Sequence, residues 1–275
     1  MKKAVFVLFS CLDRFFTRLS GKQNICLILA SMVFAAEGGS VRGQSADLCR
    51  MISYEDVPYI ICGLDLSRVQ LTLERNTIPG PARAVYSGIV ASRSRVSASA
   101  PVIIMNAGMY DVQLHPIGLY IEKGEIIKKI SKAGGKGNFH MLPNGVFYIS
   151  GMTAGITETN RYVKMNLKPD YATQSGPMLV IDNKIHAQFK ADSLSLKIRN
   201  GVGIAENGKI WFAISRQTVS FHAFARLFRD YLNCRDALYL DGTISALYSR
   251  ETGITGGLFP VGPLIIVTEK NQTDL

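Results

Sequence analysis

The sequence has few of the side chains that hold metal ions in proteins. Only four of its 275 residues are histidine and five are cysteine, and both kinds are scattered along the chain. Structural zinc sites need Cys and His ligands at short, regular spacings, and no such spacing occurs here. The sequence therefore predicts no metal site and no other cofactor.

Clustered positive charge is missing as well. The net charge is +10, but residues 1–43 hold six basic and two acidic side chains, so +4 of it lies there and +6 remains for residues 44–275. That remainder contains no run of five basic residues, whereas nucleic-acid-binding proteins concentrate Lys and Arg on one element. The charge predicts no nucleic-acid partner and favours an anionic ligand or association with a cell-envelope surface.

No apolar run is long enough to cross a bilayer comfortably. The run at 25–36 has 12 residues, with Arg14, Arg18 and Lys22 before it and the small residues Val41 and Gly43 after it. This order is typical of a secretory signal. We expect residues 1–43 to be a signal peptide or an N-terminal anchor, residues 44–275 to form the domain, and the protein to be periplasmic or extracellular.

Export changes what the cysteines can do, because disulfides persist outside the cytoplasm. If Glu55-Asp56 is a two-residue hairpin turn, Cys49 and Cys62 lie directly opposite each other. A cross-strand disulfide is then possible, and Cys234 would be a single buried thiol that behaves as a small apolar residue.

Short apolar runs separated by turn residues dominate the rest of the chain, which favours strands. Hairpin turns are predicted at Lys123-Gly124, Asn144-Gly145 and Asn207-Gly208. The last two are Asn-Gly pairs, which are a strong hairpin signal. The strands are expected at 51–54, 57–62, 69–73, 102–105, 118–122, 125–130, 139–142, 146–149, 178–181, 202–205, 210–214, 236–240 and 263–268.

Two helices stand out among the strands. Apolar residues recur at helical spacing over 81–92, with Pro81 at the start, and over 221–232, where Ser220 is a suitable N-cap. No linker or repeat interrupts residues 44–275. The pattern predicts a single α+β domain of mostly antiparallel sheets with a few packed helices.

Polar and small residues gather where four of these strands begin or end. An isolated junction of this kind is ordinary turn chemistry, but functional groups are often carried on loops held by a rigid scaffold. We therefore expect the four to converge on one pocket. The junctions are 106–111, 174–177, 199–203 and 241–245.

Six motifs give the sequence a specific resemblance. In chain order they are NAGMY, PIGLYIEKG, GNFHMLPNGVFY, ATQSGPMLV, IRNGVGI and ALYLDGTIS. The series resembles the phosphodiester glycosidase family, over about residues 50 to 268. This resemblance implies an enzyme, many of whose relatives are exported bacterial proteins, that splits a sugar from a phosphodiester. It places around the active site Asn106, Gly108, Gln174, Ser175, Arg199, Asp241, Gly242 and Ser245.

The residues allow a mechanism for such a reaction. Asp241 would act at the anomeric carbon, either as nucleophile or as the base for water, while the fork of Arg199 would grip the phosphate. A leaving phosphate has a second pKa of about 6 and needs little acid assistance. Asp111 is a reserve carboxylate. The other expected contacts to sugar or phosphate are Asn106, Gly108, Gln174, Ser175, Asn200, Gly242, Thr243, Ser245 and His140, the last also a candidate proton carrier.

Two other interpretations stay open. A non-catalytic envelope protein could bind an anionic glycan or a phospholipid headgroup with the same groups, and a hydrolase of envelope or exopolysaccharide would also fit. Neither the sugar, the stereochemical outcome nor the oligomeric state follows from the sequence.

Overall fold

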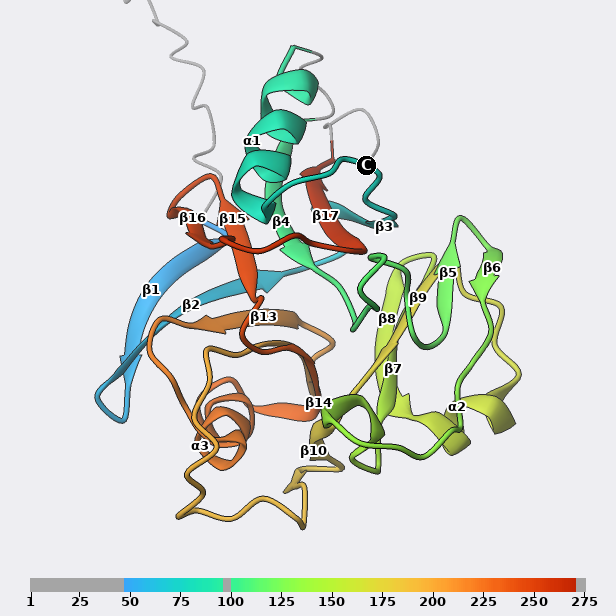
Figure 1. Ribbon diagram of the computed structural model, residues 1–275, viewed down its shortest axis with the longest axis vertical. Helices are drawn as coiled ribbons and strands as arrows, with labels where there is room; N and C mark the ends of the chain where they lie inside the picture. The colour runs from blue at the N-terminus through green and yellow to red at the C-terminus, as the bar shows by residue number, and fades with distance from the viewer. Residues whose placement is uncertain (1–46, 96–99, 271–275) are drawn as a thin grey trace, which may run out of the picture. The chain divides into compact units, whose positions relative to one another are not determined.

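The computed structural model describes residues 47–95 and 100–270 of the chain. These form a single domain built mainly of antiparallel strands with a few short helices, so the predicted α+β class is confirmed (Figure 1). The expected signal or anchor at 1–43 lies outside the described residues. Within the described ranges, no helix has both the length and the apolar character needed to span a bilayer.

The first sheet carries two of the predicted junctions. In it β12 pairs with β14, and the start of β12 lies opposite the end of β14, with Asn200 beside Asp241. Its strands, in spatial order, are β1 (Cys49–Tyr54), β2 (Val57–Leu64), β13 (Ile210–Ser215), β12 (Asn200–Ala205), β14 (Cys234–Asp241), β10 (Met178–Ile181) and β11 (Lys184–Ile185).

The second sheet has five strands and is covered by the first helix, α1 (Ala82–Arg93), whose apolar face packs on Ile104 and Ile266. Pro81 precedes this helix, as predicted. In spatial order, the strands of this second sheet are β16 (Gly253–Gly256), β15 (Ala246–Ser249), β4 (Pro101–Asn106), β17 (Leu264–Glu269) and β3 (Val69–Glu74).

The third sheet corrects one predicted hairpin. Residues 139–142 are not a strand, because Asn138–His140 forms a 3-10 turn, η2, and β7 pairs instead with β8. The buried side chain of Asn144 donates to the Phe139 carbonyl at 2.9 Å, so Asn144-Gly145 links this turn to β7. The strands are β6 (Glu125–Lys128), β5 (Tyr120–Glu122), β9 (Tyr171–Ser175), β7 (Gly145–Ser150) and β8 (Thr153–Glu158), with helix α2 (Thr159–Met165) after them.

The late helix begins as predicted and then changes its winding. Ser220 Oγ accepts the amide of Ala223 at 3.1 Å and so caps helix α3 (Phe221–Arg226). A π-helical turn, η3 (Leu227–Tyr231), continues it. Apolar side chains of all three sheets meet in one core, which includes Phe212 of β13, Met105 of β4 and Phe147 of β7. This shared core fixes the strand ends that carry the polar junctions.

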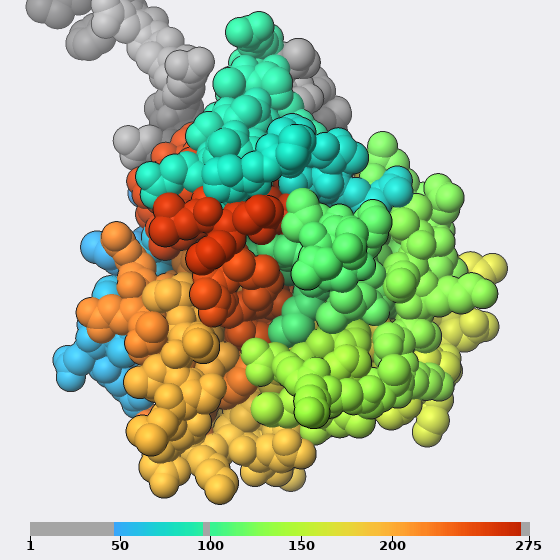
Figure 2. Space-filling view, viewed as in Figure 1, coloured from blue at the N-terminus to red at the C-terminus, as the bar shows by residue number. Residues whose placement is uncertain are grey.

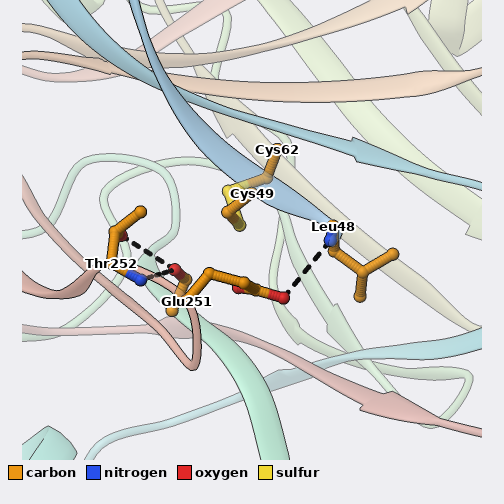
Figure 3. Close-up of a disulfide and its surroundings, with 6 residues drawn as sticks. Leu48, Cys49, Cys62, Glu251 and Thr252 are labelled. Carbon is orange, nitrogen blue, oxygen red and sulfur yellow. Dashed lines mark hydrogen bonds between the residues drawn. A yellow bond between two sulfur atoms is a disulfide. The ribbon is translucent and has the colours of Figure 1, made fainter. Parts of the chain in front are cut away.

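The disulfide that the sequence allows between Cys49 and Cys62 is present, and Cys234 is a buried free thiol (Figure 3). The two bonded cysteines face each other across the β1–β2 hairpin. Next to them the amide of Leu48 donates to Glu251 Oε1 at 3.2 Å, which ties the hairpin to the turn after β15.

Reduction of this disulfide should lower the free energy of unfolding by about 3 kcal/mol, the effect expected when a loop of this length is closed in the unfolded chain. The bonded residues are 13 apart in sequence. Urea denaturation of the oxidised and reduced protein measures the difference, and a Cys234→Ala variant, which keeps the bond, is the control. A midpoint that dithiothreitol leaves unchanged would contradict the expectation.

Candidate functional site

The four predicted junctions do converge. Asn106 lies at the end of β4, Ser175 at the end of β9, Asn200 at the start of β12 and Asp241 at the end of β14. Hydrogen bonds between them join all three sheets. In Figure 2 the segments around residues 110, 140, 195 and 245 adjoin on the viewed face, although they lie far apart in sequence.

A pair of buried asparagines holds the junctions together. Asn106 Oδ1 accepts hydrogen bonds from Asn200 Nδ2 at 2.7 Å and from the amide of Ala246 at 2.9 Å. Asn200 Oδ1 in turn accepts the amide of Asp241 at 2.8 Å. Asn106 and Asn200 are both fully buried. Their side chains therefore fix the backbone beside Asp241, and the substrate contacts predicted for them stay predictions.

Asp241 is the ionisable group at the centre of this site. Its side chain is 8% exposed, and Oδ1 accepts the amide of Gly242 at 2.6 Å. Within residues 47–95 and 100–270, Oδ2 has no hydrogen-bond partner and no basic side chain forms an ion pair with Asp241. Burial raises the pKa of Asp241 to about 7, against the opposing effect of the Gly242 amide. Such a carboxyl exchanges its proton near neutral pH, as acid-base groups in enzymes do.

The turn after Asp241 is short and is held by hydrogen bonds between its own residues. The amide of Ser245 donates to the Gly242 carbonyl at 2.8 Å, and Ser245 Oγ donates to the Asp241 carbonyl at 3.1 Å. Ser245 is buried and its side chain serves the turn, while its contact with substrate stays a prediction. Thr243 is exposed at the tip of the turn, where a ligand can reach it.

Arg199 does not have the geometry of a two-pronged phosphate clamp. Its side chain is 0% exposed. Nε donates to the Val219 carbonyl and Nη2 to the Ser195 carbonyl, both at 2.8 Å, and the guanidinium lies 3.6 Å from the centroid of the Phe221 ring. Only Nη1 is without a partner in the described part of the chain. Backbone carbonyls thus occupy two of the three nitrogens of the guanidinium, and the phosphate grip stays a prediction.

Gln174 and Ser175 are likewise occupied by the protein. Gln174 Oε1 accepts the amides of Leu119 and Ser131, each at 2.9 Å, and Nε2 donates to the Ser131 carbonyl at 2.7 Å and to Thr159 Oγ1 at 3.1 Å. Ser175 Oγ donates to the Leu240 carbonyl at 3.1 Å. Gln174 thus ties segments around the third sheet to each other, and Ser175 ties the third sheet to β14 of the first, while their contacts with substrate stay predictions.

Glycine at position 108 is required by close packing. A Cβ there would lie 2.5 Å from both the Gln174 carbonyl oxygen and Thr173 Oγ1, and the Gly108 amide donates to that same Oγ1 at 3.2 Å. The residue is buried, so it brings β4 and β9 together. Gly108 thus helps to assemble the site, and its contact with substrate stays a prediction.

Asp111 and His140 lie at the periphery. Asp111 Oδ1 accepts the amides of Gln113 and His115, each at 2.9 Å, and its side chain is 40% exposed. The reserve carboxylate is thus a turn residue. His140 is half-buried, with Nδ1 at 2.8 Å from the Ala133 carbonyl oxygen and the ring against Phe139. It shapes the 131–142 loop beside the site.

Three tyrosines near Asp241 were not predicted as site residues. The charge of Asp241 contributes to raising the pKa of Tyr86, Tyr110 and Tyr239, each of which burial already raises. Tyr239 stands two residues before Asp241, and Tyr110 ends the NAGMY motif. These positions within the motifs are the sequence signal that could have identified both tyrosines as site residues. Aromatic surroundings explain why the carboxyl is so poorly solvated.

Within the described residues, no cluster of His, Cys, Asp or Glu could hold a metal ion. A surface cavity of about 610 Å³ lies beyond the 111–116 loop, lined by Arg75, Ile78 and His115 among others, and it does not include Asp241. We base the site on the buried carboxyl and its hydrogen bonds, because size alone does not supply reactive groups.

Comparison with known proteins agrees with the resemblance carried by the six motifs. The profile of the phosphodiester glycosidase family matches residues 99–267, a range that holds all four junctions. YigE of Escherichia coli, an uncharacterized protein, is 40% identical over 166 residues. That match covers 60% of this chain and 65% of YigE, less than two thirds of its length.

Three solved structures share the fold. The catalytic domain of zebrafish N-acetylglucosamine-1-phosphodiester alpha-N-acetylglucosaminidase, auto-inhibited by its pro-peptide, has a TM-score of 0.56 at 13% identity, covering 81% of this chain and 82% of that one. A hypothetical protein from Synechocystis has a TM-score of 0.51 at 12% identity over 81% and 61% of the two chains. A putative exported protein from Burkholderia pseudomallei has a TM-score of 0.51 at 11% identity over 77% and 74%.

Proposed function

Because this chain belongs to the phosphodiester glycosidase family, which supports a hydrolase-type function, we propose that it hydrolyses the bond between a sugar and a phosphodiester. In this proposal Asp241 acts in its ionised form at the anomeric carbon, as nucleophile or as base for water. The substrate is a glycan or sugar whose anomeric oxygen belongs to the phosphodiester.

The observation that carries the proposal is the state of Asp241. It is a nearly buried carboxyl whose Oδ2 has no hydrogen-bond partner among the described residues, and burial raises its pKa to about 7. A group that serves only packing gains nothing from this arrangement, since a buried unpaired carboxylate destabilises the fold. Perturbed carboxyls of this kind concentrate at catalytic sites.

A single carboxyl suits this class of substrate. Most glycosidases use two, one of which protonates the leaving oxygen. The second candidate, Asp111, is bound into its own turn. A departing phosphate, with a second pKa of about 6, accepts the bond electrons without a strong acid beside it. The Asp241 carboxylate and the preorganised turn after it then supply the remaining chemistry at the anomeric carbon.

Activity should rise with pH through about 7. Only the ionised carboxyl of Asp241 acts in the proposal, and its raised pKa leaves it protonated below that value, so kcat/KM should fall about tenfold per pH unit on the acid side. The measurement is kcat/KM from pH 5 to 9 on a set of sugar-1-phosphate methyl diesters, whose phosphate stays ionised throughout.

One outcome would count against the ionised role of Asp241, and another would count against the proposed hydrolase function. A rate that falls above pH 7 would assign Asp241 the role of a proton donor. Absence of turnover on every diester, together with a rise in melting temperature on adding them, would favour a protein that only binds anionic glycans or headgroups.

We also propose that the protein works outside the cytoplasm, in the periplasm or extracellular space, with residues 1–43 as signal or anchor. The disulfide between Cys49 and Cys62 supports this, because such bonds persist in oxidising compartments. Envelope or exopolysaccharide is then the accessible source of substrate. Mass spectrometry of the N-terminus of secreted protein would locate the processing site.

A further inference from the structure

The turn after Asp241 packs against a buried tyrosine. A Cβ placed on Gly242 would collide with the hydroxyl oxygen of Tyr239, while the next nearest atoms, Tyr239 Cζ at 3.7 Å and the Ile198 carbonyl oxygen at 3.8 Å, are ordinary contacts. Gly242 does not have a positive φ, so its backbone conformation is open to alanine. The phenol oxygen alone therefore dictates glycine at this position.

Tyr239 is itself held rigidly. Its side chain is fully buried, its ring lies edge-on to Phe221 with 4.8 Å between centroids, and its amide donates to the Pro177 carbonyl at 3.1 Å. The guanidinium of Arg199 lies 5.4 Å from the centroid of the Tyr239 ring. Arg199, in turn, is fastened to Val219 and Ser195.

Gly242 connects this support to the reactive group. Its amide is the sole hydrogen-bond donor to the carboxyl of Asp241 within the described ranges, at 2.6 Å to Oδ1. The amide belongs to the residue at which an added Cβ would collide with the Tyr239 hydroxyl. A rigid path of contacts thus runs from Arg199 and Phe221 through Tyr239 and Gly242 to Asp241.

We propose that Tyr239 is a positioning residue for Asp241, which acts through its hydroxyl contact with Gly242 to aim the Gly242 amide at Oδ1. The proposal rests on the proposed function, in which the carboxyl of Asp241 reacts. It also gives Arg199 a role other than a phosphate clamp, since the buried guanidinium fixes the ring of Tyr239.

The contact between Tyr239 and Gly242 affects the ionisation of the Asp241 carboxyl. The titratable groups that face Asp241 are Tyr86 from α1, Tyr110 from the loop after β4 and Tyr239 from β14, with the charge of Arg199 beyond Tyr239. The Gly242 amide favours the ionised carboxyl. If Tyr239 loses its hydroxyl, the turn can relax away from Oδ1, and the apparent pKa of Asp241 should rise.

A double-substitution cycle tests the contact. Gly242→Ala forces a methyl group against the phenol oxygen, so kcat should fall about 100-fold, as displaced catalytic groups typically cause. Tyr239→Phe should shift the acid limb of the pH profile upward. In the variant with both changes the methyl group has room, and kcat should recover at least about tenfold over Gly242→Ala, a coupling expected only of residues in contact.

Tyr86→Phe is the matched control, because that hydroxyl bonds to the Ala246 carbonyl at 3.4 Å and is not among the atoms nearest to a Cβ on Gly242. It should not rescue Gly242→Ala. The carboxyl of Asp241 is also followed by carbon-13 NMR titration, with melting temperature recorded in parallel. This readout needs no turnover, so it still reports the coupling if Asp241 proves not to be catalytic.

Additive losses in the double variant, with the NMR pKa of Asp241 the same in wild type and Tyr239→Phe, would overturn the proposal. A fall in melting temperature for Tyr239→Phe with no change in the NMR titration would assign Tyr239 to packing alone and would also overturn it. Rescue together with a shifted titration supports it.

Discussion

Asp241→Asn is expected to abolish turnover and to raise the stability of the protein at pH 8. Asparagine keeps an oxygen to accept the Gly242 amide, which in the wild type bonds to Oδ1 at 2.6 Å, but it can neither attack carbon nor take a proton. Loss of the reacting group should reduce kcat by about 10⁴-fold or more, comparable to the loss of other essential catalytic side chains.

The stability gain follows from the raised pKa. In the unfolded chain Asp241 ionises near 3.8, whereas in the folded protein it ionises near 7. The folded state therefore holds its proton more tightly, and the wild type loses stability as pH rises from about 4 to about 7. The loss is complete above that range and is on the order of 4 kcal/mol. Asparagine does not titrate, so it avoids this loss.

Melting temperatures of wild type and Asp241→Asn at pH 5 and pH 8, with turnover of a sugar-1-phosphate diester, measure both effects. The gap in melting temperature should be wider at pH 8. Asp111→Asn is the control, since Asp111 is a half-exposed turn residue, and it should keep its activity. Full turnover by Asp241→Asn would remove Asp241 from the chemistry, and an equal gap at both pH values would contradict the buried titration.

Features encoded in neighbouring residues could be predicted from the sequence. The Glu55-Asp56 turn set the register that places Cys49 opposite Cys62, and Ser220 capped its helix. Asn144-Gly145 carries the same local signal as a hairpin turn and is not one. Its outcome depends on contacts with Phe139 and Thr159, which a local pattern does not contain.

The convergence of the four junctions was predictable, but the hydrogen-bond partners of their side chains were not. Strand ends rich in Asn, Ser and Gly indicate where strands meet, because each such residue can form several hydrogen bonds. Whether those bonds go to a ligand or to the protein depends on partners distant in sequence. Gln174 and Ser131 are one example, and Arg199 with Val219 is another. Buried polar groups are nearly always satisfied internally.

Asn106→Ala is expected to be among the most destabilising single substitutions in the site. The change removes the one oxygen that accepts both Asn200 Nδ2 and the amide of Ala246. Both donors are buried between sheets and would lose their partner, at about 1–3 kcal/mol each. A loss of about 4 kcal/mol corresponds to a fall of about 10 °C in melting temperature for a domain of this size.

Asn106→Asp separates this effect from a general intolerance of change at the position. Aspartate keeps the accepting oxygen, and when protonated it has nearly the shape of asparagine, so at pH 5 the variant should melt close to wild type. At pH 8 the same variant should melt well below it, because burial of a carboxylate with no cation beside it is costly. Calorimetry at the two pH values distinguishes the cases. Wild-type stability in Asn106→Ala, or equal damage by both substitutions at pH 5, would show that the Asn106–Asn200 pair does not hold the strand ends around Asp241.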